Sequence, residues 1–154
     1  GRGRGSTFTL TLQTVEHEAT LDHHVPEAQP LVRGLRILLV EDHPSTAQAM
    51  RRLLIGMGHQ VTVGATMREA LEHAAKETFD LLISDLGLPD GDGLDLMREL
   101  RSSGLRGVCL SGYGMDADIR RSKDAGFSVH LVKPVDMRQL ASAIAEATAC
   151  GAPL

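Results

Sequence analysis

The sequence lacks the features that would place a protein in a membrane, outside the cell or on nucleic acid. It has no apolar run approaching the roughly 20 residues of a membrane span, and no signal peptide. Its two cysteines, Cys109 and Cys150, lack the spacing of metal ligands, which favours reduced thiols in a cytosolic protein. Positive charge is not in excess, because 20 acidic residues oppose 16 lysines and arginines. We therefore predict a cytoplasmic protein that contacts neither membranes nor nucleic acid.

The length and composition favour one globular domain with a tail. The chain has 154 residues, and 42% of them are hydrophobic, which is enough to bury a core. Residues 1–12 alternate threonine with Phe8, Leu10 and Leu12, the pattern of a half-buried strand. Residues 13–34 show no periodicity, and we interpret them as a linker. The chain does not begin with methionine, so we expect it to be part of a longer protein.

From residue 35 onward, predicted strands and helices alternate five times. The strands are expected near residues 36–40, 60–64, 81–85, 107–111 and 129–132. The helices are expected at about 45–57, from Thr66 onward, at about 93–102, at about 117–125 and from Asp136 onward. Strict alternation with short loops predicts a parallel sheet with helices on both faces. The expected fold is a flavodoxin-like (βα)5 three-layer α/β sandwich, a five-stranded parallel sheet of order 2-1-3-4-5.

Short sequence signals support the helix positions. Thr66-x-x-Glu69 and Asp136-x-x-Gln139 are capping-box patterns. The fourth helix is the weakest, because Ile119 is its only large apolar residue. The first, third and fifth strands are nearly continuous apolar runs, as expected of strands covered on both faces. The residues expected to face the core from the second and third helices are Met67, Leu71, Ala74, Leu94, Met97 and Leu100.

Charged and hydroxyl side chains lie where the predicted strands end. Glu41 and Asp42 follow the first strand, and Asp85 ends the third. Ser111 ends the fourth strand, and Lys133 follows the fifth. The carboxyl ends of parallel strands meet at one edge, where open α/β sheets bind ligands, so we expect these side chains to lie close together.

This set of side chains favours phosphate chemistry with a metal ion. Three carboxylates at one edge repel one another, which favours their neutral forms unless a cation is present. Mg²⁺ relieves this repulsion, because it takes oxygen ligands and keeps waters that phosphate oxygens can replace. Lys133 can neutralise one phosphate oxygen, and the Ser111 hydroxyl can donate to another. Since an aspartate carboxylate is a competent nucleophile toward phosphorus, the pattern predicts a magnesium site that handles phosphate.

Residues 35–150 resemble a response-regulator receiver domain. The matching positions are the acidic pair Glu41-Asp42, the phosphoacceptor Asp85, the hydroxyl residue Ser111 and the pair Lys133-Pro134. The resemblance implies Mg²⁺-dependent phosphorylation of Asp85 from the phosphohistidine of a histidine kinase, with catalytic roles for Lys133 and Ser111. It also implies that phosphorylation alters the interactions of the face formed by the fourth helix, the fifth strand and the fifth helix.

The resemblance further implies how the metal ion is held. The implied ligands of Mg²⁺ are Asp42, Asp85 and the backbone carbonyl of Gly87. Glu41 is implied to assist through a water molecule. A cis peptide bond before Pro134 is also implied, which the chemistry of X-Pro bonds permits.

Ser111 and His130 are the residues expected to form the switch. His130 stands three residues before Lys133, where many receiver domains carry Tyr or Phe. Phosphorylation is expected to pull Ser111 inward and to free space near His130. The usual aromatic switch therefore does not carry over directly to this chain.

The N-terminal segment carries a second resemblance. Residues 1–12 look like the last strand of a histidine-kinase ATP-binding domain, just after its glycine-rich box. With residues 13–34 as linker, the chain resembles the C-terminal receiver of a hybrid sensor histidine kinase in a bacterial phosphorelay. The implied partners are a histidine kinase domain, in cis or in trans, and a histidine phosphotransfer protein. By itself such a receiver catalyses only its own phosphoryl transfer and autodephosphorylation.

Other functions stay open at this point. One is a stand-alone single-domain response regulator, and another is a protein-binding module that does not depend on phosphorylation. A flavodoxin is disfavoured, because Glu41 and Asp42 would repel a flavin phosphate. A Mg²⁺-dependent phosphatase is disfavoured, because Gly87 stands where that class carries a second aspartate. The segment Asp90-Gly91-Asp92-Gly93 has too few ligand positions for a calcium loop, and we interpret it as the cap of the third helix.

Overall fold

The computed structural model describes residues 34–112 and 116–149. The strand predicted over residues 1–12 lies outside the described residues, as does the predicted linker apart from Gly34. The strands are β1 (Arg36–Val40), β2 (Gln60–Gly64), β3 (Leu81–Asp85), β4 (Gly87–Leu88), β5 (Gly91–Asp92), β6 (Arg106–Ser111) and β7 (Val129–Val132). The helices are α1 (Pro44–Gly56), α2 (Met67–Lys76), α3 (Gly93–Leu100), the 3₁₀ turn η1 (Arg101–Ser103), α4 (Asp116–Ala125) and α5 (Met137–Ala149).

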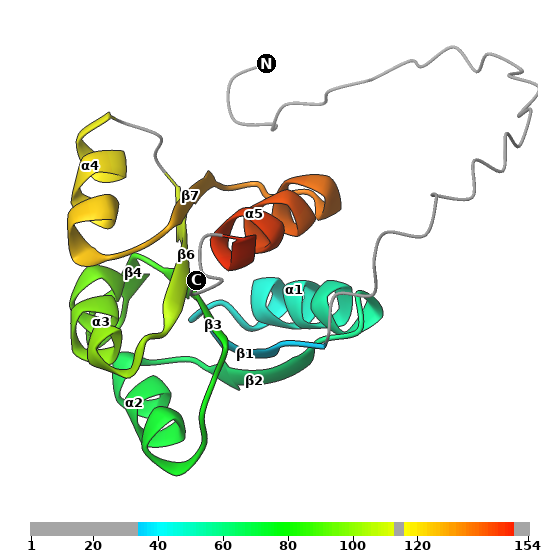
Figure 1. Cartoon of the computed structure of the whole chain (residues 1–154), viewed down its shortest axis with the longest axis horizontal. Helices are drawn as coiled ribbons and strands as arrows, with labels where there is room; N and C mark the ends of the chain where they lie inside the picture. The colour runs from blue at the N-terminus through cyan, green and yellow to red at the C-terminus, as the bar shows by residue number, and fades with distance from the viewer. Residues whose placement is uncertain (1–33, 113–115, 150–154) are drawn as a thin grey trace, which may run out of the picture. The chain divides into compact units, whose positions relative to one another are not determined.

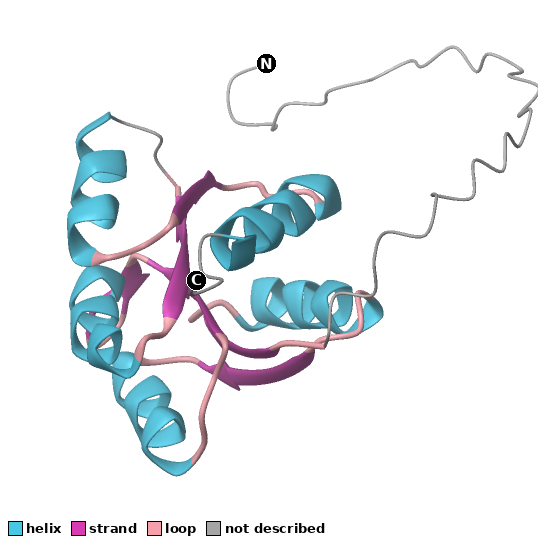
Figure 2. Ribbon diagram, in the orientation of Figure 1, coloured by secondary structure: helices cyan, strands magenta, loops and turns pink. Residues whose placement is uncertain are grey.

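The five longer strands form one parallel sheet in the order β2-β1-β3-β6-β7. With β6 and β7 as the fourth and fifth predicted strands, this is the expected order 2-1-3-4-5. Helices α1 and α5 cover one face of the sheet, and α2, α3 and α4 cover the other (Figure 1). Figure 2 shows the sheet between these two helical layers. The predicted three-layer fold is therefore confirmed.

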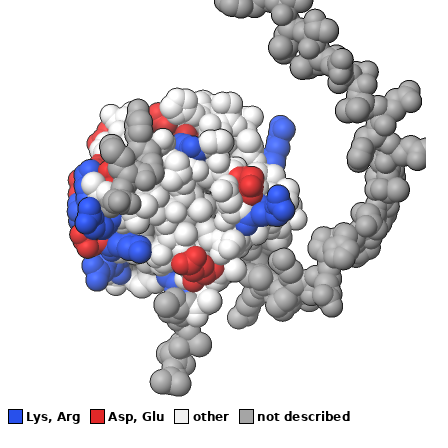
Figure 3. All heavy atoms as spheres, turned by 90° about the horizontal axis from the view of Figure 1, so that it is seen from above, with Lys and Arg blue, Asp and Glu red and all other residues white. Residues whose placement is uncertain are grey.

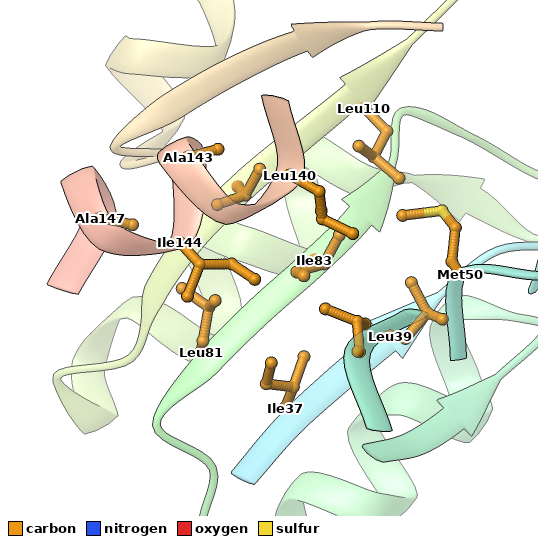
Figure 4. Packing of buried hydrophobic residues seen from close by; sticks show 12 residues of the cluster. Ile37, Leu39, Met50, Leu81, Ile83, Leu110, Leu140, Ala143, Ile144 and Ala147 are labelled. Atoms are coloured by element: carbon orange, nitrogen blue, oxygen red, sulfur yellow. The ribbon is translucent and has the colours of Figure 1, made fainter. Parts of the chain in front are cut away.

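The face toward α1 and α5 buries the first of two apolar clusters. Ile37 and Leu39 of β1 lie beside Ile83 of β3, and all three are fully buried. Met50 of α1 and Leu140 of α5 project onto them (Figure 4). Each such side chain contributes roughly 1.5–3 kcal/mol relative to an exposed one.

The opposite face buries the second cluster. Leu38 and Leu82 point toward α2, α3 and α4, where they meet Leu94 and Met97 of α3. Successive side chains of a strand point to opposite faces, so the unbroken apolar runs of β1 and β3 supply both clusters.

The fifth predicted strand differs from the expectation that it is covered on both faces. β7 is an edge strand, its residues are half-buried at most, and Val132 is 42% exposed. Its Val129 and Leu131 pack against the cluster that α5 covers. An apolar run therefore marks a strand here without showing whether it lies at the centre or at the edge of the sheet.

The buried residues of α2 and α3 also differ in part from the prediction. Ala70 is the fully buried residue of α2, whereas Met67, Leu71 and Ala74 are only half-buried. A Cβ atom on Gly64 at the end of β2 would lie 3.3 Å from the backbone nitrogen of Ala70. Small residues at both positions therefore let α2 lie close against the sheet. In α3, Leu94 and Met97 are buried as predicted, with Leu96 in addition, and Leu100 is half-buried.

Both predicted capping boxes are present. The Thr66 hydroxyl accepts from the Glu69 N–H at 3.1 Å, and the Glu69 carboxylate accepts from the Ala65 N–H at 2.8 Å. The Asp136 carboxylate accepts from the Gln139 N–H at 2.8 Å, and the Gln139 side chain accepts from the Asp136 N–H at 3.0 Å. These bonds satisfy backbone donors that a helix start leaves without helical partners.

A short hairpin after β3 was not predicted. Strands β4 and β5 pair antiparallel, and Asp92 at the end of β5 caps α3 by accepting from the Leu94 N–H at 2.8 Å. The turn residue Asp90 reaches the start of α2 instead. Its carboxylate accepts from the N–H groups of Met67 at 2.7 Å and Arg68 at 3.0 Å. The cap interpretation of this segment is confirmed for Asp92, and Asp90 adds a cap on a second helix.

We expect replacement of Asp90 by alanine to lower the melting temperature at neutral pH by a few degrees, because two helix-start donors lose their acceptor. The hydrogen bond from the Arg68 N–H, followed by that from Met67, holds the pKa of Asp90 below its ordinary 3.8. This contribution to stability is present above pH 3.8 and is lost as pH falls through the lowered pKa. The melting difference between the two proteins should therefore shrink in acid. Glu99→Ala, which removes an exposed carboxylate of α3, is the control and should change little.

Candidate functional site

The sheet register brings the predicted site residues to one edge. Val40 pairs with Ser84, so Glu41 and Asp85 are the next residues on neighbouring strands. Ser111 pairs with Val132, and the Lys133 N–H donates to the Ser111 carbonyl at 2.8 Å. Asp85 of β3 pairs with Leu110 of β6, one residue before Ser111, and the three strand pairs thus place Glu41, Asp85, Ser111 and Lys133 together.

The Lys133 ammonium joins two of the carboxylates. Its Nζ lies 2.5 Å from Oε2 of Glu41 and 2.6 Å from Oδ2 of Asp85. The Glu41 side chain is fully buried, and that of Asp85 is 15% exposed. Burial of one carboxylate beside another is costly without a counter-ion, and the ammonium supplies the opposite charge.

The protonation of Lys133 follows from these contacts. Burial acts to lower the pKa of the ammonium, but hydrogen bonds to Asp85 and Glu41 and the charges of both carboxylates outweigh it and raise the pKa above 10.5. Lys133 is therefore charged at neutral pH. Its stabilising contribution is present below pH 10.5 and is lost as pH rises through the raised pKa.

The second residue of the acidic pair has a different neighbour. Oδ1 of Asp42 lies 2.8 Å from Nδ1 of His43, and Oε1 of Glu41 lies 3.5 Å from the same nitrogen. One ligand atom from each of these three residues lies within 4.8 Å of the others, so they can hold a metal ion together. His43 was not predicted as part of the site, although its position directly after the acidic pair was a signal.

The second oxygen of Asp85 faces the loop that follows β3. Its Oδ1 accepts from the Gly87 N–H at 3.3 Å. This contact holds Gly87 beside the carboxylate, while the carbonyl of Gly87 stays a predicted ligand. The peptide bond between Lys133 and Pro134 is cis, as the resemblance implied.

A hydrogen-bonded chain leads from Ser111 to α4. Oγ of Ser111 lies 2.8 Å from Nε2 of His130, and Nδ1 of His130 lies 3.0 Å from Oγ of Ser122. Ser122 is fully buried, and its hydroxyl donates to the Ile119 carbonyl at 2.9 Å. Nδ1 of His130 is therefore the donor to Ser122, and in the neutral ring Nε2 is the acceptor for the Ser111 hydroxyl. Sequence reasoning found Ser111 and His130 and missed Ser122.

A hollow of about 390 Å³ lies beside Asp85 and Ser111. Its wall also includes Asp92 at the start of α3 and two residues of α4, Asp118 and Arg121. The sequence singled out Asp92 only as a helix cap. It offered no signal for Asp118 and Arg121, because the rotation of α4 over the sheet cannot be read from so polar a helix. The hollow is large enough for a small bound group at the Asp85 carboxylate.

The parallel-sheet fold and the charged residues at the carboxyl ends of its strands together define a receiver domain of a two-component system. Comparison with known proteins gives the same class. The chain belongs to the response regulator receiver domain family, whose sequence pattern matches residues 37–145.

Relatives of several kinds share this domain. The KDP operon transcriptional regulatory protein KdpE of Escherichia coli K12 is 37% identical over 105 residues, which is 68% of this chain and 47% of KdpE. The aerobic respiration control sensor protein ArcB of the same strain is 32% identical over 147 residues, which is 93% of this chain and 19% of ArcB. The structure of the Vibrio cholerae chemotaxis protein CheY4 matches with a TM-score of 0.70 at 26% identity, covering 74% of this chain and 98% of CheY4. The chain thus spans less than half of the length of either sequence relative.

Among the described residues, the helices are too short and too polar to cross a bilayer.

Replacement of Lys133 by alanine should destabilise the protein without metal and strengthen its binding of Mg²⁺. The variant leaves Glu41 and Asp85 without their shared cation, at a cost of about 1–2 kcal/mol, less than for a fully buried pair because the site is partly open to water. Given the prediction that Asp85 is a Mg²⁺ ligand, the ion would no longer compete with an ammonium for this carboxylate. Melting temperatures measured against Mg²⁺ concentration should therefore rise more steeply than for wild type. The control is Lys123→Ala on the exposed side of α4. An equal response in the Lys133 variant would show that ammonium and metal do not share these carboxylates.

Proposed function

We propose that Asp85 accepts a phosphoryl group from the phosphohistidine of a histidine kinase. The observation that carries this proposal is the position of Asp85, which contacts the Lys133 ammonium at 2.6 Å and opens on a hollow shared with Ser111. A nucleophile and a hydroxyl donor therefore border one space, and the Lys133 ammonium contacts the nucleophile beside it.

The transfer uses the carboxylate of Asp85 as nucleophile. A carboxylate oxygen forms a bond to phosphorus while the bond between phosphorus and the histidine nitrogen breaks, and the imidazole leaves with that electron pair. Lys133 balances the charge of the phosphoryl oxygens, and the Ser111 hydroxyl donates a hydrogen bond to one of them.

The residues present fit a Mg²⁺ ion. Asp42, Asp85 and the carbonyl of Gly87 would bind the ion, and Glu41 would assist through water. The fit rests on the donor set, since carboxylate and carbonyl oxygens are the ligands that Mg²⁺ prefers and ligand atoms of Glu41 and Asp42 already lie within 4.8 Å of each other. Bound there, Mg²⁺ would neutralise charge on the transferred phosphoryl group.

The proposed parent protein is a hybrid sensor histidine kinase. The match to the sensor protein ArcB takes in 93% of the chain and therefore includes most of residues 1–34 as well as the receiver. We propose that residues 1–12 belong to the ATP-binding domain of the kinase and that residues 13–34 link it to the receiver. The proposed partners are a histidine kinase domain, in cis or in trans, and a histidine phosphotransfer protein, all in the cytoplasm.

The proposed switch runs from Ser111 through His130 to α4. The Ser111 hydroxyl has a single hydrogen. When the His130 ring is neutral and its Nδ1 donates to Ser122, this hydrogen points to Nε2 of His130. A phosphoryl oxygen on Asp85 competes for it, so phosphorylation weakens the bond to His130. The bond from His130 to Ser122 carries the change to α4, and the output face is formed by α4, β7 and α5.

Asp85→Asn tests the proposed function. Wild-type protein incubated with acetyl phosphate and Mg²⁺ should gain one acid-labile phosphoryl group by intact mass, and the variant should gain none because the amide is not a nucleophile toward phosphorus. Asp124→Asn, which changes an exposed carboxylate of α4, should label like wild type. Labelling of the Asp85 variant to the wild-type extent would refute the assignment.

Hydrogen exchange with and without beryllofluoride, a phosphoryl mimic, tests the switch. Amides of α4 and β7 should change more than those of α1 and α2, because the path through His130 ends on α4. In a Ser122→Ala variant the change in α4 should shrink, while the loop after Asp85 should respond as in wild type. Changes confined to α1 and α2 would contradict the proposed output face.

A further inference from the structure

The hollow beside Asp85 has a cation on its far wall. Asp85 and Ser111 line it from the ends of β3 and β6, while Asp118 and Arg121 line it from α4. Among its described lining residues, Arg121 is the positively charged one. Figure 3 shows that Lys and Arg side chains gather at the edge of the molecule that carries α3 and α4. A negatively charged group attached to Asp85 would therefore enter a space that an arginine already borders.

Arg121 is loosely held in this structure. Its Nη2 lies 3.6 Å from Oδ2 of Asp92, and its Nη1 lies 3.7 Å from Oδ1 of Asp118. These separations exceed the roughly 2.7–2.9 Å of a strong charge-assisted hydrogen bond. The Arg121 side chain is 61% exposed, and exposed pairs of this kind are worth about 1 kcal/mol or less. The guanidinium can therefore change partners at little cost.

Two glycines leave the space near Asp85 uncrowded. A Cβ atom on Gly87, two residues after Asp85, would meet no atom within 4 Å, and the same holds for Gly112, directly after Ser111. Both glycines line the hollow. These two positions therefore add no side chain to the lining of the hollow that Asp85 and Arg121 share.

We propose that Arg121 is a phosphoryl-binding residue that exchanges Asp92 and Asp118 for the phosphoryl group on Asp85. This inference rests on the proposed function. A phosphoryl group brings roughly −1.5 to −2 charges near neutral pH, more than either carboxylate offers. The planar guanidinium also matches phosphoryl oxygens through two parallel N–H donors, which a lysine ammonium cannot do.

The exchange couples the phosphoacceptor to two helices. Asp92 caps α3 through Oδ1, which accepts from the Leu94 N–H, while its Oδ2 pairs with Arg121. Departure of the guanidinium leaves the cap in place and breaks the ion pair that links α3 to α4. Arg121 then draws α4 toward Asp85, a second connection that is independent of the chain through His130 and Ser122.

Beryllofluoride affinity measured by NMR titration with Mg²⁺ tests this proposal. Arg121→Gln should weaken binding roughly tenfold, equivalent to about 1.4 kcal/mol and within the range for a hydrogen bond to a charged group. The affinity of Arg121→Lys should fall between those of Arg121→Gln and wild type, because lysine keeps the positive charge but lacks the two parallel N–H donors of the guanidinium. Arg120→Gln is the matched control, since it removes the same charge from the neighbouring exposed position of α4 and should bind like wild type.

A double-mutant cycle separates direct binding from a general charge effect. Asp92→Asn keeps a capping side chain but removes the competing carboxylate, so it should tighten beryllofluoride binding in the wild-type background. This gain in beryllofluoride affinity should largely disappear when Asp92→Asn is combined with Arg121→Gln. In wild type, the Nε–H resonance of Arg121 should shift on beryllofluoride binding, a readout that a merely structural role would not move.

The outcomes distinguish this inference from the function on which it rests. If wild-type protein does not bind beryllofluoride, or Asp85→Asn protein binds it equally well, both proposals fail. If binding requires Asp85 but Arg121→Gln and Arg120→Gln bind like wild type, the phosphoacceptor assignment stands and the role of Arg121 is wrong.

Discussion

The contact on which the site depends is the Lys133 ammonium between Glu41 and Asp85. A fully buried glutamate directly beside a partly buried aspartate is unfavourable unless a cation lies between them. The ammonium comes from the loop after β7, across β6 from β3, so its position requires the register of every strand between. The parallel sheet therefore acts as a rigid frame that delivers separate charges to one point, and the two apolar clusters make the frame stiff.

The elements around this frame are held by different forces. Helices α1 and α5 pack through large apolar side chains. Among the α4 side chains whose burial is described, Ser122 and Ala125 are fully buried and Ile119 is half-buried. The hydroxyl of Ser122 and the long ion pair of Arg121 with β5 are polar contacts of α4 with the rest of the domain. Polar contacts of this kind depend on which charges are nearby, and elements with few apolar contacts open most readily. We therefore expect a change of charge at Asp85 to act most strongly on α4.

Much of the fold and part of the site could be predicted from sequence. Strand positions, helix caps and sheet order follow from local patterns, and the sheet order brings Asp85, Ser111 and Lys133 to one edge. The two-residue strands β4 and β5 are too short to leave a pattern. Asp90 capping a helix that lies earlier in the chain is a tertiary contact. Arg121 depends on the rotation of a polar helix, which no apolar stripe reveals. Elements and caps that depend on neighbouring residues could thus be predicted from the sequence. Side-chain contacts between different elements could not.

The site carries its own counter-ions, and this limits how it can change state. The Nζ of Lys133 lies 2.5 Å from Glu41 and 2.6 Å from Asp85. Its single positive charge therefore already balances these carboxylates when no phosphoryl group is present. A phosphoryl group adds more negative charge than the ammonium alone can balance. We expect the remaining balance to come from a divalent ion on the side of Asp42 and from a cation on the side of α4. Because a metal ion arrives from solution and leaves the backbone in place, it can support the transfer itself. In the proposed role of Arg121, a cation attached to a helix converts the same electrostatic demand into movement of α4, beside the hydrogen-bonded chain through His130 and Ser122.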